Sequence, residues 1–164
     1  SYSAICGITE EEMLTQMDSD IDWLATRMEL PREQALAQLK RNYDGYHFTW
    51  PSPDIYNPFS LLNAFADGKM DSYWFGSGTP TYLIEMLKKF NVLPSTIGGE
   101  EVILSDFDAS TGRMDNPTPL LYQNGYLTIK NHDKETDLYL LDIPNQEVRI
   151  GLMRSLSPIS SHFI

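Results

Sequence analysis

"PLLYQNGYLTIKNHDKETDLYLLDI", residues 119–143, is the stretch that decides the fold class of this chain. Its first part predicts a short helix that ends at Gly125, because glycine readily takes the left-handed conformation that closes a helix. The next two parts, 126–130 and 138–143, are rich in β-forming residues, and the polar turn "NHDKET" separates them. The stretch therefore predicts a helix followed by a β-hairpin.

A last helix is expected to start near Pro144 and to carry Val148, Leu152 and Leu156 toward the core, since these residues lie four apart. Helix, hairpin and helix in this order resemble the second half of a winged-helix module. We expect residues 116–164 to form such a winged-helix-like region.

Upstream of residue 92 the apolar residues recur at spacings of three and four, which predicts a series of helices. Thr9 and Glu12 form a capping-box pattern at the start of the first helix. Asn57, Pro58 and Gly68 mark the cap, the first turn and the end of a compact helix. The other helices are expected from about Ser19, from Pro31 and from Thr79.

Residues 93–115 are rich in Gly, Pro, Ser and Asp and contain only one short apolar run, so we expect a loop or linker there. The predicted organisation is a helical region (1–92), this linker (93–115) and the winged-helix-like region (116–164). The predicted fold class is mainly α with a small β-hairpin, that is, α+β.

The chain of 164 residues has 23 acidic and 12 basic residues, a formal net charge of -11. This charge opposes binding to the phosphates of nucleic acids. The single cysteine and three histidines make a disulfide framework or a zinc site improbable. No apolar run approaches the ~18 residues of a membrane span. We expect a cytoplasmic protein that binds neither membrane nor nucleic acid directly.

No catalytic motif is present in this sequence. A G-x-x-x-x-G-K-[ST] phosphate loop and a G-x-S-x-G nucleophile elbow are both missing. "FGSGTP", residues 75–80, reads more simply as a loop before a helix than as a phosphate site. Asp106 and Asp108 could place two carboxylates on one face of an extended segment, but no E-x-K follows to complete a metal site, so caps or loop polarity explain them better. We predict no catalytic, metal or cofactor residues in this chain.

"RNYDGYHFTW", residues 41–50, is the most unusual stretch and allows three interpretations. Asp44 could orient His47 as a general base. Alternatively, tyrosines with buried rings and hydrogen-bonded hydroxyls could anchor a helix end to the following strand. In the third interpretation the stretch docks against another domain. The candidate residues for such an interaction surface are Tyr43, Asp44, Gly45, Tyr46, His47 and Trp50.

Several long segments occur in an order that resembles a bacterial AAA-ATPase-like family, whose members commonly carry a PD-(D/E)XK nuclease-like domain at the C-terminus. The segments are "GITEEE", "NYDGYHF", "IYNPFSLLNAF", "YWFGSGTPTYLIEMLKK", "PLLYQNGYLTIK" and "LYLLDIPNQEVRIGL". The resemblance covers nearly the whole chain. It implies a helical lid-like region and a winged-helix-like region between the nucleotide-binding core and the nuclease-like domain.

The resemblance implies that this chain is a middle piece without activity of its own, because it contains neither the phosphate loop nor a nuclease motif. ATP and Mg²⁺ would be cofactors of the longer parent protein, and the partners would be its ATPase core and nuclease-like domain. The arginines implied as nucleotide sensors are Arg27, Arg32, Arg41 and Arg113. The alternative is an acidic protein-interaction module with no role in nucleotide sensing.

Overall fold

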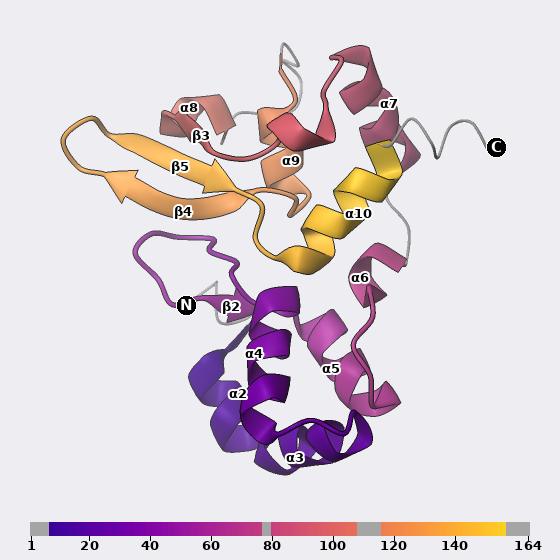
Figure 1. The fold of residues 1–164 in the computed structure, drawn as a ribbon. Helices are drawn as coiled ribbons and strands as arrows, with labels where there is room; N and C mark the ends of the chain where they lie inside the picture. The colour runs from indigo at the N-terminus through magenta and orange to yellow at the C-terminus, as the bar shows by residue number, and fades with distance from the viewer. Residues whose placement is uncertain (1–6, 77–79, 108–115, 157–164) are drawn as a thin grey trace. The chain divides into compact units, whose positions relative to one another are not determined.

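A computed structural model describes residues 7–76, 80–107 and 116–156, and it confirms a mainly helical chain with small antiparallel sheets (Figure 1). The chain forms two compact units. The first unit consists of residues 1–77 together with 145–147, and the second of residues 78–144 together with 148–164. Within the described ranges, no helix is both long and apolar enough to cross a membrane.

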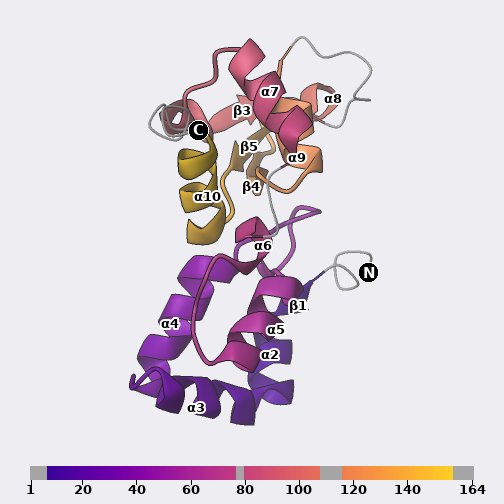
Figure 2. The same cartoon turned by 90° about the vertical axis from the view of Figure 1, so that its right-hand side faces the viewer.

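The first unit is a group of helices beside a small two-stranded sheet. The helices are α2 (Glu10–Gln16), α3 (Asp18–Arg27), α4 (Arg32–Tyr43), α5 (Pro58–Asp67) and the short α6 (Tyr73–Gly76). Strand β1 (Ile8–Thr9) pairs antiparallel with β2 (Ile55–Tyr56), and the register places Ile8 opposite Tyr56. Helix α3 crosses beneath α4 and contacts α2, α4 and α5 (Figure 2).

The core of the first unit is formed by apolar side chains that the helices turn toward one another at helical spacing. Tyr43 and Tyr56 supply the largest buried rings, so aromatic packing joins the end of α4 to β2. The other members of the core cluster are Met13, Ile21, Leu24, Leu39, Leu61, Ala64 and Phe65.

The predicted helix caps are confirmed at both helices where the sequence marks them most clearly. At α2 the Thr9 amide donates to Glu12 Oε1 at 3.0 Å, and the Glu12 amide donates to Thr9 Oγ1 at 3.1 Å. At α5 the Asn57 side chain accepts from the amides of Phe59 and Ser60. Gly68 closes α5 with a φ of 71°, a conformation that side chains with a Cβ rarely adopt.

Residues 145–147 lie far along the chain but belong to the first unit, where polar side chains hold them. Ser60 Oγ donates to Glu147 Oε1 at 2.8 Å, and the amide of Trp74 donates to Glu147 Oε2 at 3.0 Å. Asn145 Nδ2 donates to the carbonyl of Asp44 at 3.0 Å. Glu147 is buried, so hydrogen bonds replace the water that its carboxylate loses.

The second unit contains a three-stranded antiparallel sheet with helices around it. Its elements are α7 (Thr81–Lys89), the 3₁₀ turn η1 (Pro94–Thr96), β3 (Glu100–Val102), α8 (Leu104–Phe107), α9 (Thr118–Gln123), β4 (Thr128–Asp133), β5 (Leu138–Asp142) and α10 (Gln146–Leu156), which belongs to this unit from Val148 onward. The predicted hairpin is confirmed as β4 and β5, with an irregularity between Ile129 and Asn131. Val148 and Leu152 are buried as expected, whereas Leu156 is only half-buried.

The structure corrects the prediction that residues 93–115 are a loop or linker. β3 lies inside this range and pairs with β5, giving the sheet order β3-β5-β4. The short run Glu100–Val102 has little β character of its own, and it becomes a strand because the free edge of β5 supplies its hydrogen-bonding partners. Residues 108–115 lie outside the described part of the chain.

The expected boundary at residue 92 also moves. α7 belongs to the second unit, because the division falls between residues 77 and 78. The helical pattern of α7 is the same as that of the helices before it, so periodicity alone does not tell which core it joins. The expected start of this helix at Thr79 lies outside the described residues.

Candidate functional site

The segment between α4 and α5 folds back on itself and forms the frame of the candidate site. Tyr46 and Ile55 pair through two backbone hydrogen bonds of 3.1 Å each, one in each direction. The amide of Asn57 donates to the carbonyl of Tyr43 at 2.9 Å. These bonds close residues 46–55 into a loop (the 46–55 loop) against the C-terminal end of α4.

Tyr43 anchors this frame from inside the core. Its hydroxyl donates to the carbonyl of Asp71 at 2.6 Å and accepts from the amide of the same residue at 2.9 Å. Burial raises the pKa of the Tyr43 hydroxyl above its ordinary value, so the neutral form is retained. The interpretation of this tyrosine as a structural anchor agrees with these contacts.

His47 is held by the 46–55 loop itself. Ser52 Oγ donates to the carbonyl of Thr49 at 2.7 Å, so it accepts from His47 Nδ1, which lies 3.0 Å away. The other ring nitrogen, Nε2, pairs with Asp54 Oδ1. The imidazole also packs edge-on against Trp50, with 4.8 Å between ring centroids.

The structure therefore does not support the alternative in which Asp44 orients His47 as a general base. The carboxylate beside the imidazole belongs to Asp54, and both ring nitrogens face hydrogen-bond acceptors within the protein. His47 is buried, so this arrangement holds the loop closed rather than presenting a base to a substrate.

Asp44 is turned toward α4 instead. Its side chain is 2% exposed, and its Oδ2 accepts from Lys40 Nζ at 3.1 Å, one helical turn earlier. Burial raises the pKa of the Asp44 carboxyl, and the Gly45 amide and the Lys40 ammonium offset only part of this effect. Among the described residues, Asp44 Oδ1 has no hydrogen-bond partner.

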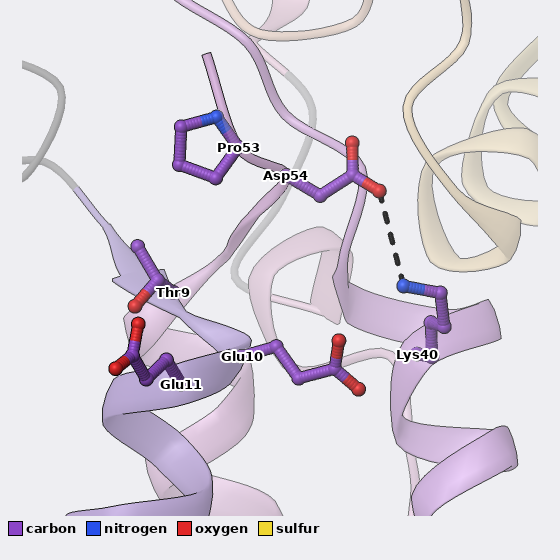
Figure 3. Close-up of a pocket in the computed structure, with 6 residues that line it drawn as sticks. All are labelled: Thr9, Glu10, Glu11, Lys40, Pro53 and Asp54. Atoms are coloured by element: carbon purple, nitrogen blue, oxygen red, sulfur yellow. Dashed lines mark ion pairs between the residues drawn. The ribbon is translucent and has the colours of Figure 1, made fainter.

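A pocket of about 230 Å³ opens beside this pair (Figure 3). Its lining comes from three separate segments: Thr9, Glu10 and Glu11 at the start of α2, Lys40 on α4, and Pro53 and Asp54 in the 46–55 loop. Figure 3 shows the side chains of Glu10, Lys40 and Asp54 converging on one side of the pocket. Lys40 Nζ lies 3.8 Å from Asp54 Oδ2.

Lys40 is the one lysine or arginine in this lining, and its surroundings favour its charge. Desolvation lowers the pKa of Lys40, but the hydrogen bond to Asp44 and the nearby carboxylates outweigh it, and the pKa is raised. The Lys40 side chain therefore carries its positive charge at neutral pH.

The predicted interaction surface is corrected by the burial of its side chains. Tyr43, Asp44, Tyr46 and His47 are buried, and Gly45 is buried with them. Trp50 is half-buried and its neighbour Phe48 is 37% exposed. None of these six residues is among those that line the pocket.

Sequence reasoning missed Lys40, Asp54 and Glu10 as members of this site. The spacing of Lys40 and Asp44, four residues apart across a helix end, is a signal that identifies one pair in advance. The positions of Glu10 and Asp54 depend on the pairing of β1 with β2 and on loop closure, which no local pattern encodes.

The predicted arginines differ in how they are bound. Arg32 is paired with Asp18 at 2.5 Å and with Asp22 at 2.6 Å, and its pKa is raised by these contacts. Arg27 lies 5.5 Å from the ring centroid of Trp23. Arg41 is exposed in the last turn of α4, and Arg113 lies outside the described residues.

The described ranges contain no group of three or more His, Cys, Asp or Glu side chains with metal-binding geometry. Asp106 lies on α8, a helix, and not on the extended segment that a metal pair would need, while Asp108 lies outside these ranges. The acidic pocket is therefore the feature on which a functional argument rests.

Comparison with known proteins relates this chain to part of a longer one. It is similar to an "Uncharacterized protein in vnfD 5'region" of Azotobacter chroococcum mcd 1, with 32% identity over 160 residues. The match covers 94% of this chain but 28% of the relative, so the chain spans little more than a quarter of that protein. No model of a known protein family and no solved structure matches the chain.

Proposed function

We propose that this chain is the helical lid and connecting region of a AAA-type ATPase and links a nucleotide-binding core to a C-terminal nuclease-like domain. ATP and Mg²⁺ would bind in the core of the longer cytoplasmic protein. The observation that carries the proposal is the ordered series of segments along the chain that resemble this family. The relative that the chain matches is longer than the chain itself.

The second unit supports the winged-helix-like part of the proposal by its topology. α7, β3, α8, α9, β4 and β5 follow one another in the order helix, strand, helix, helix, strand, strand. The strand of the earlier half pairs with the last strand of the hairpin, as in winged-helix domains. The hairpin turn carries Asp133 and Glu135 around Lys134, a charge pattern that favours contact with protein over DNA.

Arg41 is the arginine that the geometry favours as a nucleotide sensor. It is exposed, and no ion pair of Arg41 is recorded in the described part of the chain, whereas Arg32 is committed to two aspartates. An exposed guanidinium is free to approach a phosphate, since it does not first have to leave a carboxylate.

The test is ATP binding and turnover by the full-length protein that contains this segment. Arg41→Ala should lower turnover at least several-fold, and Arg27→Ala and Arg32→Ala serve as comparisons. Arg149→Ala, an exposed arginine of α10, is the matched control and should leave turnover unchanged. Unchanged binding and turnover in all variants, including Arg113→Ala, would contradict the sensing role.

The alternative function, an acidic protein-interaction module, is favoured by a specific observation as well. Three of the charged side chains that line the pocket are carboxylates, on a chain with a net charge of -11.

A further inference from the structure

We propose that the 46–55 loop is closed by a proton-dependent latch, in which His47 holds the loop fully only while both of its ring nitrogens carry a proton. The latch consists of the Thr49 carbonyl and the side chains of Ser52, His47 and Asp54. The inference goes beyond the proposed function, because it concerns proton binding by the first unit and needs no nucleotide.

The hydrogen-bond partners of the imidazole set its protonation state. Ser52 has one hydroxyl hydrogen, which it donates to the Thr49 carbonyl at 2.7 Å. Ser52 Oγ can therefore only accept from His47 Nδ1, which lies 3.0 Å away. The carboxylate of Asp54 contacts Nε2 and likewise accepts. Both ring nitrogens then have to donate, and an imidazole that donates from both is the positively charged form.

The surroundings of His47 supply the stabilisation that this charge needs. The residue is buried, and burial by itself opposes the charged form of an imidazole. The Asp54 carboxylate beside Nε2 offsets this effect, since a hydrogen bond between two charged groups is stronger than one between neutral groups. Trp50 packs edge-on against the imidazole, with 4.8 Å between ring centroids, and so limits its rotation away from the two acceptors.

The other charged groups near the latch belong to α4, its end and α2. Lys40 Nζ lies 3.8 Å from Asp54 Oδ2, so the Asp54 carboxylate lies between two cations when His47 is protonated. Lys40 also contacts Asp44, and Glu10 adds a further negative charge near the Lys40 ammonium. Burial raises the pKa of Asp44, so an experiment has to separate its titration from that of His47.

Loss of the ring proton breaks one of the latch bonds, whichever nitrogen gives it up. If Nδ1 loses the proton, it accepts instead of donating, and the Ser52 hydroxyl has to turn away from Thr49 to reach it. If Nε2 loses the proton, its lone pair faces the Asp54 carboxylate and the two repel each other. Either way the loop keeps fewer of the bonds that close it.

The direction of the pH dependence follows from this need for a charged ring. Closure should be strongest below the pH at which His47 loses its proton and should weaken above it. Of the two ion pairs that Asp54 forms in the described structure, only the one with Lys40 remains once His47 is neutral. Since Asp54 lines the pocket, the latch couples the protonation of a buried histidine to the charge of that lining.

The experiment is a pH titration of the ¹⁵N-labelled 164-residue chain from about pH 5 to about pH 9, a range that includes the usual titration of histidine. At the acidic end both ring nitrogens of His47 should give the signals of protonated nitrogen. As the pH rises, one of them should lose its proton. The amides of Thr49 and Ser52 and the indole N–H of Trp50 should shift with the same midpoint.

Variants of the two acceptors test whether the latch sets the protonation of the ring. Ser52→Ala removes the acceptor at Nδ1, so a neutral ring with its proton on Nε2 suffices, and the midpoint of the His47 titration should fall by about 0.5 pH unit. Asp54→Asn removes the negative charge beside Nε2 and should lower the midpoint by about 1 pH unit. Ser19→Ala, at an exposed position on α3, is the matched control and should leave it unchanged.

Two further controls separate the latch from other titrating groups. His132 pairs through Nε2 with Asp137 on the hairpin of the second unit, so its titration should be the same in the wild type and in Ser52→Ala. Asp44→Asn removes the other carboxyl whose titration could move the amides of the loop, and the His47 transition should persist in this variant.

Four outcomes would overturn the inference. They are a His47 ring that stays in one protonation state over the whole range, loop amides that do not follow the ring, an unchanged midpoint in either Ser52→Ala or Asp54→Asn, and loss of the transition in Asp44→Asn. Because these measurements contain no nucleotide, their failure leaves the ATP-turnover test of the proposed function intact, and the reverse also holds.

Discussion

At the scale of single residues, the first unit keeps a charged group in its interior at a cost to stability. Asp44 is 2% exposed, and its ionised form is stabilised by one lysine and by the Gly45 amide. Burial raises the pKa of Asp44 above its ordinary value of 3.8, and nearby Asp54 adds a smaller repulsion.

The raised pKa of Asp44 has a defined consequence for the pH dependence of stability. Between pH 3.8 and the raised pKa, the folded state binds more protons at this site than the unfolded state does. The contribution of Asp44 to the free energy of unfolding should therefore rise as pH falls through the raised pKa, and should level off below pH 3.8.

Urea unfolding of the wild type and of Asp44→Asn at pH 7, 5.5 and 4.5 measures this effect. The difference in unfolding free energy should move in favour of the wild type as the pH is lowered. Asp20→Asn, an exposed position on α3, is the matched control and should show no such trend. A difference that is constant with pH, or that moves the other way, would contradict the assignment.

At the scale of elements, the sequence predicts helices best where residues next to a helix end form hydrogen bonds with its free backbone groups. The capping residues can be recognised in the sequence, because each of them bonds to groups within four residues of itself. They are Thr9 and Glu12 at α2, and Asn57 and Gly68 at α5. β3 is the opposite case, since its identity as a strand comes from β5, some forty residues later. Helices with local caps are thus predictable, and strands that complete a sheet are not.

The cap of α5 provides a quantitative test of this local stability. Asn57→Ala removes the acceptor for the amides of Phe59 and Ser60 and should lower the free energy of unfolding by about 1 kcal/mol. Asn57→Asp keeps an acceptor and should retain most of the stability. Thermal unfolding followed by circular dichroism compares the variants, and equal losses in both would show that the cap is not the cause.

At the scale of the whole chain, composition and periodicity correctly predict a mainly helical α+β protein but misplace the division between its parts. α7 joins the second unit although its periodicity is the same as that of the helices before it. Residues 145–147 join the first unit although α10 begins at Gln146 and belongs to the second unit from Val148 onward. The same holds for the candidate site. The stretch around Asp44 is unusual in composition, but the residues that line the pocket are brought together by contacts between separate segments of the chain.

The assignment of residues 145–147 to the first unit is testable by hydrogen exchange. Leu61 is fully buried in the core of the first unit, and Leu61→Ala should cost roughly 2–5 kcal/mol through the cavity that it leaves. Amide exchange should accelerate in the first unit, with residues 145–147 included. The matched variant Leu121→Ala, in the core of the second unit, should spare them, and the opposite pattern would contradict the division.

The hydrogen bonds that Ser60 and Trp74 donate to Glu147, and the one that Asn145 donates to the carbonyl of Asp44, also bear on how the protein is made. A ribosome synthesises the helices of the first unit long before it reaches Glu147. Ser60 and the Trp74 amide therefore lack their acceptor until late in translation. The first unit then completes its folding only after most of the second has been synthesised, contrary to the usual order in which N-terminal domains fold first. Residues 1–77 expressed alone would therefore lack residues 145–147, which belong to the first unit.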